Sequence, residues 1–274
     1  MTDVLDQARP AAPRLGAWRR VPYFIGRIAV PLLAVILWQW LGANGKLPQY
    51  LSYPSAIAGA TRELAAEGEL WVYLRDSLIR LIGGFAIGSA IGMFAGLLAG
   101  LSKPVGQFVD PLFAFVYPIP KIAFLPIVLL VFGLGSATQT AIVALSVSFP
   151  VFLAAQHAVA QMDRHLVWVA RNFEMPYSTM VFRVVLPATM PGIFAGLRVA
   201  LALSFVSLFA AELIGAKTGL GLLISEGEDW VRYDIMLTGV VAYGVLGFLA
   251  DRLLMAVRKR VLRGVLLGTS EGRR

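Results

Sequence analysis

The side chains that could do chemistry in this chain are the few charged residues within or beside long apolar runs. A charged side chain at the centre of a bilayer costs about 2.5–3.5 kcal/mol on insertion scales, so each one needs a partner or a role. Arg198 lies eleven residues beyond Pro187, deep in its run. It could be a countercharge for an anionic solute. The favoured interpretation is a structural ion pair, with Asp110 as a possible partner.

Other charges lie nearer the ends of apolar runs. Arg80 falls three residues into its run, so its long side chain is expected to reach outward to water. Glu212 lies at the outer end of another run, where it could belong to an outer gate, contact another protein, or be an interfacial residue with no special role. Asp251 and Arg252 are expected to mark a membrane boundary.

The composition excludes several kinds of catalytic or metal site. The chain has no cysteine, so disulfides and thiolate ligands are ruled out. His157 and His165 do not form an HExxH pattern, and we predict no metal site and no catalytic residue. The fragments GANGK and GAKTG do not fit the nucleotide-binding pattern GxxxxGK[ST]. If ATP drives this protein, another subunit must therefore hydrolyse it.

The balance of residue types indicates an integral membrane protein. Of 274 residues, 58% are hydrophobic and 15% are charged, against about 25% charged residues in soluble domains. The mean hydropathy is +0.74. The net charge of +8 comes largely from basic residues at the ends of apolar runs, which predicts membrane orientation and no nucleic-acid partner.

Six apolar runs predict an all-α fold with about six transmembrane helices. The expected organisation is a cytoplasmic tail at 1–20, a first span with an external segment at 21–76, a core at 77–260 and a cytoplasmic tail at 261–274. Basic residues gather on one side of this arrangement, so both termini are placed in the cytoplasm. The expected spans are residues 21–42, 77–101, 105–133, 137–160, 188–214 and 235–257.

Prolines in the third run predict a broken helix. Pro118 and Pro120 flank Ile119 just before Lys121, and a straight helix with this many prolines would lose backbone hydrogen bonds. Broken helices at membrane depth are tolerated where they face protein or a watery cavity. Pro118, Pro120 and Lys121 are therefore candidates for a translocation pathway, together with Arg198 and Glu212. The alternative, of equal weight for the prolines, is that they only shape packing.

A glycine repeats every four residues through the second run, at positions 84, 88, 92, 96 and 100. This spacing puts a stripe without side chains on one helix face, where another helix can approach closely. We expect a packing surface, either within the subunit or between subunits.

Residues 163–187 are too polar to lie in hydrocarbon and are expected to face water. Helical spacing of Leu166, Val169, Ala170 and Phe173 ends at Met175-Pro176, and a second amphipathic piece follows from 177 to 185. The pattern predicts two short helices meeting at an angle. They would either dock into a partner or lie flat in the headgroups.

This stretch resembles the cytoplasmic coupling loop of ABC importer permeases, whose motif is Glu-Ala-Ala, three residues, Gly, nine residues, Ile, one residue, Leu-Pro. Aligned on Leu186-Pro187, Ala170 takes the second alanine and Val184 the isoleucine. Trp168 replaces the motif's Glu, and Glu174 replaces its glycine. In the family the glycine permits the turn between the coupling helices, and Pro176 is hypothesised to force that turn here.

The resemblance extends from about 77 to 260 and is closest to the nitrate, sulfonate and taurine branch. The stretches that carry it are SLIRLIGGFAIGSAIG, YPIPKIAFLPIVLLVFGLG, PATMPGIFAGLRVAL and AELIGAKTGLGLLI. It implies a type I permease core in the bacterial inner membrane, a second permease copy, two ABC ATPase subunits that use the ATP, and an external solute-binding protein. The residues it places against the ATPase are Ala170, Arg171, Asn172, Glu174, Met175, Pro176, Leu186 and Pro187.

Three alternatives stay open on the residues alone. The same type of transporter could carry a vitamin precursor related to thiamine or riboflavin instead of a sulfonate, taurine, nitrate or similar anion. An ATPase-independent secondary transporter or channel would need coupling carboxylates or an inverted repeat, and neither is clear in the sequence. A membrane-embedded enzyme would need reactive side chains clustered at one depth, and the spans offer no such cluster.

Overall fold

The computed structural model describes residues 23–48 and 50–270, and every regular element in these ranges is helical. The predicted tail at 1–20 lies outside the described residues. The helices are α1 (Tyr23–Ala43), α2 (Pro54–Glu67), α3 (Glu69–Leu101), α4 (Lys103–Val116), the 3₁₀ turn η2 (Lys121–Phe124), α5 (Leu125–Phe132), α6 (Ser136–Ala160), α7 (Arg164–Asn172), α8 (Tyr177–Met180), the π-helical turn η3 (Val181–Val185), α9 (Leu186–Gly215), α10 (Leu220–Asp229) and α11 (Tyr233–Ser270).

Four helices are long and apolar enough to cross a membrane. They are α3, α6, the continuous helix from Tyr177 to Gly215, and α11 up to Arg263. Three of them clearly exceed their predicted bounds: α3 begins at Glu69 instead of residue 77, the helix that ends at Gly215 begins at Tyr177 instead of residue 188, and α11 continues past residue 257 to Ser270. The first predicted span, residues 21–42, coincides with α1.

The third predicted span is broken, as its prolines predict. Helix α4 ends at Val116, and the helical segment Lys121–Phe132 leaves it at an angle of 92°. Pro118 and Pro120 lie in the break, where they can neither donate to a helical ladder nor continue one. If the bent pair is one crossing, it is the fifth.

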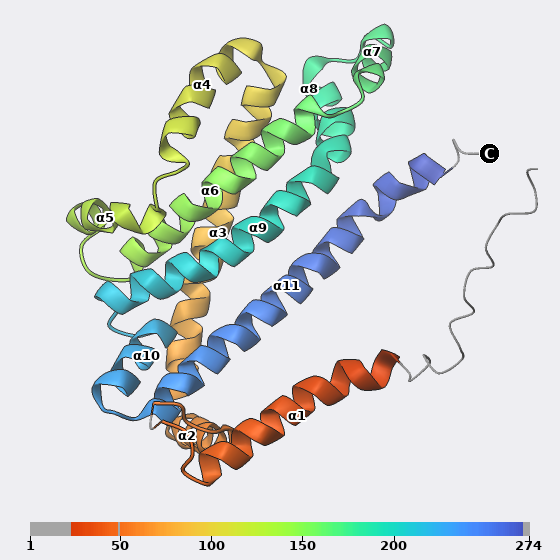
Figure 1. Ribbon diagram of the computed structural model, residues 1–274. Coiled ribbons are helices and arrows are strands. Elements are labelled where there is room, and N and C mark those ends of the chain that lie inside the picture. The colour runs from red at the N-terminus through yellow and green to blue at the C-terminus, as the bar shows by residue number, and fades with distance from the viewer. Residues whose placement is uncertain (1–22, 49, 271–274) are drawn as a thin grey trace, which may run out of the picture. The chain divides into compact units, whose positions relative to one another are not determined.

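The glycine stripe packs α3 against α6 within the subunit. Figure 1 shows α3 crossing behind α6, which lies beside α9. A Cβ on Gly84 would lie 2.6 Å from the Val143 side chain, and one on Gly92 would lie 3.0 Å from the Phe152 backbone nitrogen. Because real Cβ contacts are longer, only glycine permits this approach. The stripe is a packing surface inside one chain.

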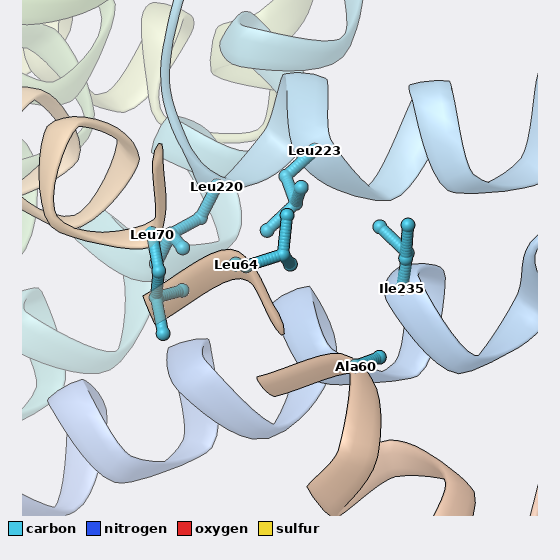
Figure 2. Packing of buried hydrophobic residues seen from close by; sticks show 6 residues of the cluster. All are labelled: Ala60, Leu64, Leu70, Leu220, Leu223 and Ile235. Carbon is cyan, nitrogen blue, oxygen red and sulfur yellow. The ribbon is translucent and has the colours of Figure 1, made fainter. Parts of the chain in front are cut away.

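Near the start of α3, a hydrophobic cluster joins four helices. Figure 2 shows Leu70 of α3 and Leu223 of α10 among side chains contributed by α2 and α11. At the edge of this region Arg232 donates hydrogen bonds to Asp234 (2.9 Å) and to Glu63 (3.0 Å). These two carboxylates, Asp234 foremost, raise the pKa of Arg232 above its usual range. The contacts tie α2 to the start of α11.

The chain divides into two compact units, of which the first ends at Ser55 and the second begins at Ala56. In the first unit, the backbone N–H of Ser55 donates to Gln39 Oε1 (2.9 Å) and Gln39 Nε2 donates to Ser55 Oγ (2.9 Å). These two bonds hold the segment after α1 against that helix. All of the site residues described next belong to the second unit.

Candidate functional site

Arg80 and Glu212 form an ion pair buried between α3 and α9. Arg80 Nη1 lies 2.8 Å from Glu212 Oε1, and the two residues are 3% and 0% exposed. The expectation that Arg80 reaches outward to water is wrong. A helix that begins at Glu69 places Arg80 more than three turns inside it. There the guanidinium has an acidic partner, so it does not need solvent.

The Glu212 carboxylate is fully supplied with hydrogen-bond donors. Ser77 Oγ donates at 2.8 Å, the Tyr243 hydroxyl at 2.6 Å and the Gly221 N–H at 2.9 Å. A buried charge is tolerated only when its lone pairs are satisfied in this way. Glu212 is therefore the centre of a polar cluster that joins α3, α9, α10 and α11. It is not an interfacial residue.

The same cluster holds the short loop between α9 and α10. Arg80 Nη1 donates to the Thr218 carbonyl oxygen (2.6 Å), and the Thr218 hydroxyl donates to Asp76 Oδ2 (2.6 Å). Gly219 has a φ of +126°, and a Cβ there would lie 2.6 Å from both Arg80 Nη1 and Glu212 Oε1. Gly219, the second glycine of the GAKTG sequence, is thus required by the close approach of these side chains as well as by its backbone angle.

Arg198 pairs with Asp251, which corrects the suggested pairing with Asp110. Arg198 Nε donates to Asp251 Oδ1 at 2.7 Å and Nη2 donates to Oδ2 at 3.1 Å. Asp110 instead accepts a hydrogen bond from Gln156. The Arg198–Asp251 pair joins α9 to α11 at one end of a mainly apolar cavity of about 770 Å³. Its side chains are 57% and 30% exposed in the single chain.

The break between α4 and α5 borders a second cavity, of about 500 Å³. Pro118, Pro120 and Lys121 all line it, and α6 and α9 supply the opposite wall. The structure thus brings these three pathway candidates together. Arg198 borders the other cavity, and Glu212 is buried in the polar cluster.

Two cavity residues that the sequence analysis did not single out are Ser146 and Ser207. The Ser207 hydroxyl donates to Ser146 Oγ at 2.7 Å, and Ser146 Oγ donates to the Ile142 carbonyl at 2.9 Å. A serine in an apolar helix is a weak signal, because it often bonds only its own backbone. Their meeting depends on which faces of α6 and α9 are in contact.

The loop 163–187 consists of α7, a turn, and a second helical piece that continues into α9. Asp163 caps α7 by accepting the His165 N–H at 2.9 Å. The second piece, α8, passes through the π-helical turn η3 into α9 without a break. Pro187 lacks the N–H that would bond the Arg183 carbonyl, and the wider π turn accommodates this loss. Any force on α8 would therefore reach the spanning helix directly.

Glu174 makes the turn between α7 and α8, because its φ is +52°. This left-handed conformation is the one that glycine adopts freely and other residues adopt at a cost of about 1–2 kcal/mol. Pro176 precedes α8 as its N-cap with a φ of −53°. The left-handed turn therefore occurs at the motif's glycine position itself, and Pro176 begins the second helical piece two residues later.

The predicted coupling residues differ in what they could contact. Ala170 is 3% exposed within the chain itself, and its carbonyl accepts the Met175 N–H at 3.2 Å. Arg171, Asn172, Glu174 and Pro176 are exposed, whereas Met175, Leu186 and Pro187 are half-buried. Four aromatic side chains that were not among the predicted contacts are also exposed on this loop: Trp168, Phe173, Tyr177 and Phe182.

Within the described residues, no group of three or more histidine, aspartate or glutamate side chains could hold a metal ion. The acidic residues of the sites above are instead bound to arginine, serine, threonine, tyrosine and glutamine side chains. These contacts compensate the charge of the acidic side chains and join the helices that carry them.

Comparison with known proteins matches residues 78–263 to the family described as binding-protein-dependent transport system inner membrane component. The chain is 33% identical over 234 residues to SsuC of Escherichia coli (strain K12), whose name assigns it provisionally to aliphatic sulfonate transport. That match covers 85% of this chain and 87% of SsuC.

The chain is also 30% identical over 275 residues to the bicarbonate transport system permease CmpB of Synechococcus elongatus, covering 94% of this chain and 96% of CmpB. Among solved structures, a chain of the MetNI methionine ABC transporter in an inward-facing conformation matches with a TM-score of 0.62. It has 18% sequence identity and covers 72% of this chain and 99% of that one. This last likeness concerns the fold, which is that of a type I importer permease.

Proposed function

The chain belongs to the binding-protein-dependent transport system inner membrane component family, and on that premise we propose that it forms the pathway for a small anion in an ATP-driven importer. It is a multi-pass inner-membrane protein and the permease subunit of such an importer. The best candidates for its solute are an aliphatic sulfonate, taurine, nitrate or a similar small anion.

The observation that carries the solute class is the pair of relatives that cover nearly the whole chain. The names of SsuC and CmpB refer to a sulfonate and to bicarbonate, which share little beyond small size and negative charge. The membrane-depth cavity at the α4–α5 break is consistent with such a solute, because Lys121 lies in its wall.

The loop 163–187 is the proposed contact with two ATPase subunits, which would use the ATP. Its exposed face carries both charged and large apolar side chains, as docking surfaces do. Because α8 continues into α9, closure of the ATPases would move a membrane-spanning helix. That movement would switch the pathway between outward-open and inward-open states.

A second copy of this chain and an external binding protein complete the proposed assembly. Two copies would form the pathway between them, and the binding protein would deliver the solute at the α10 end of the helices. Arg258, Lys259, Arg260 and Arg263 lie toward the opposite end of α11, and basic residues prefer the cytoplasmic side. We therefore place the C-terminus and loop 163–187 in the cytoplasm, and the basic residues Arg19, Arg20 and Arg27 before and within the first apolar run favour the same side for the N-terminus.

The test is purification of the tagged chain in mild detergent, followed by identification of co-purified proteins by mass spectrometry. The recovered complex is then reconstituted in vesicles with its binding protein. We expect an ATPase in roughly equal amount, and ATP-dependent uptake of radiolabelled ethanesulfonate. Uptake of thiamine in its place would favour the vitamin-precursor alternative. Uptake by the permease alone, without ATP, would contradict the proposal in favour of a secondary transporter.

A further inference from the structure

We propose that Lys121, with Ser207 and Ser146, forms a binding site within the membrane for a small organic oxyanion that has an apolar tail. The proposal rests on the proposed function, and it adds a specific site and a shape for the solute. The three residues line one cavity, of about 500 Å³, which is enough for a solute of a few heavy atoms.

The cavity lies near the middle of the membrane-spanning helices. Ser146 is ten residues from the first residue of α6 and fourteen from the last. At a rise of about 1.5 Å per residue, this places it roughly 15 Å from one helix end and 21 Å from the other. A positive charge at that depth is costly unless it has a function or an acidic partner.

Lys121 has no acidic partner in the part of the chain that the structure describes, where every ion pair within 4.0 Å involves an arginine. Its Nζ donates to three neutral backbone carbonyls, those of Val116 (2.8 Å), Tyr117 (2.9 Å) and Ile119 (2.9 Å). It also lies 4.2 Å from the centroid of the Phe149 ring. These contacts hold the ammonium at the cavity wall but leave its charge uncompensated.

An oxyanion in the cavity would supply the missing negative charge. One ammonium N–H can turn from a carbonyl to the anion, because a hydrogen bond between two charged groups is stronger than one to a neutral acceptor. The Ser207 hydroxyl, which now donates to Ser146 Oγ, can turn in the same way, since Ser146 keeps its own bond to Ile142. The site then offers two donors and one full positive charge.

The rest of the cavity favours a solute with an apolar part. Ile119, Phe149, Leu203 and Val206 contribute to its lining. A fully hydrated ion such as nitrate would leave these side chains facing water, whereas the alkyl group of a short alkanesulfonate would cover them. The cavity thus matches an anionic head group beside a short hydrocarbon tail.

The experiment measures uptake of radiolabelled ethanesulfonate by the complete complex in vesicles, together with the ATP hydrolysis that the loaded binding protein stimulates. We compare Lys121→Met, Lys121→Arg and Ser207→Ala, with Lys103→Met as the matched control. Lys103 is an exposed lysine at the start of α4, outside the cavity. Ser207→Ala keeps the Lys121 contacts with the helix break, so it remains informative if Lys121→Met fails to assemble.

We expect about tenfold lower uptake in Lys121→Met and about threefold lower uptake in Ser207→Ala, with stimulated ATP hydrolysis within twofold of wild type. Lys121→Arg and Lys103→Met should retain uptake. Uptake at the wild-type rate in Ser207→Ala and in any assembled Lys121→Met would overturn the site while leaving the proposed function intact. If the wild-type complex carries no ethanesulfonate, taurine or bicarbonate, both proposals are overturned.

Discussion

Arg80 and Glu212 lie 132 residues apart in the chain, yet their side chains meet at 2.8 Å in a region that water does not reach. Around them, Ser77, Thr218 and Tyr243 supply the hydrogen bonds that the two charges would otherwise take from solvent. Four helices and the loop at Thr218 are thereby held in one arrangement. If the solute enters from this end, this hydrogen-bonded cluster keeps the helix ends at the entrance in a fixed arrangement.

The ion pair predicts an asymmetric effect of single and double substitutions. Glu212→Leu should lower the free energy of unfolding by about 3–5 kcal/mol, because it leaves the Arg80 charge buried and unpaired. The double variant Arg80→Met with Glu212→Leu should recover much of that loss. Thermal unfolding of the purified protein in detergent measures both effects.

The matched control for the ion pair is Arg232→Gln, which removes an arginine that is partly exposed to solvent. Surface ion pairs contribute about 0–1 kcal/mol, so this change should shift the unfolding temperature little. Equal shifts for Glu212→Leu and Arg232→Gln would show that the Arg80–Glu212 pair is not desolvated as described.

Glu174 predicts a gain in stability from a substitution that restores the motif's residue. Its φ of +52° costs about 1–2 kcal/mol, and glycine removes this cost while adding about 0.5–1 kcal/mol of chain entropy. Glu174→Gly should therefore stabilise the turn by up to about 1.5 kcal/mol and slow hydrogen exchange at the amides of residues 174 and 175. Glu174→Ala keeps the strained φ, so a gain as large in this variant would assign the effect to the carboxylate instead.

The glycine stripe predicts a strong dependence on position along α3. Gly92→Ala should lower the free energy of unfolding by about 1–3 kcal/mol, because its Cβ would press into the backbone of α6 near Ser148 and Phe152. Gly83→Ala is the control on the same helix, since its Cβ would meet Thr140 at an ordinary 3.5 Å. A Gly92→Ala variant as stable as Gly83→Ala would contradict the packing of α3 on α6.

The sequence was sufficient to predict those features that depend on neighbouring residues. Proline geometry predicted the break at Pro118 and Pro120, and the glycine period predicted a close helix approach. The two-helix form of loop 163–187 followed from its polarity and from Met175-Pro176. These features are local, so the residues that cause them lie within a few turns of one another.

The sequence was not sufficient for features that depend on which helix faces meet. Arg198 had several possible partners, and its pairing with Asp251 instead of Asp110 is fixed by the packing of α9 on α11. Arg80 was expected to reach water because the apolar run, unlike the helix, starts only three residues before it. Ser146 and Ser207 gave only a weak signal, because their meeting requires the register of α6 against α9.

The exposed apolar side chains of loop 163–187 predict where an ATPase is held. Phe173 is 78% exposed and follows α7 directly, so Phe173→Ala should remove an anchor of the interface without disturbing the fold of the loop. We expect about tenfold less ATPase to be retained when the tagged permease is purified, with an unchanged unfolding temperature of the permease. Leu134→Ala is the control, because Leu134 is similarly exposed at the other end of α6. Ala170→Asp should also lose the ATPase, but with a lower unfolding temperature, since Ala170 is buried within the chain. Full retention of the ATPase by Phe173→Ala would place the contact on another surface.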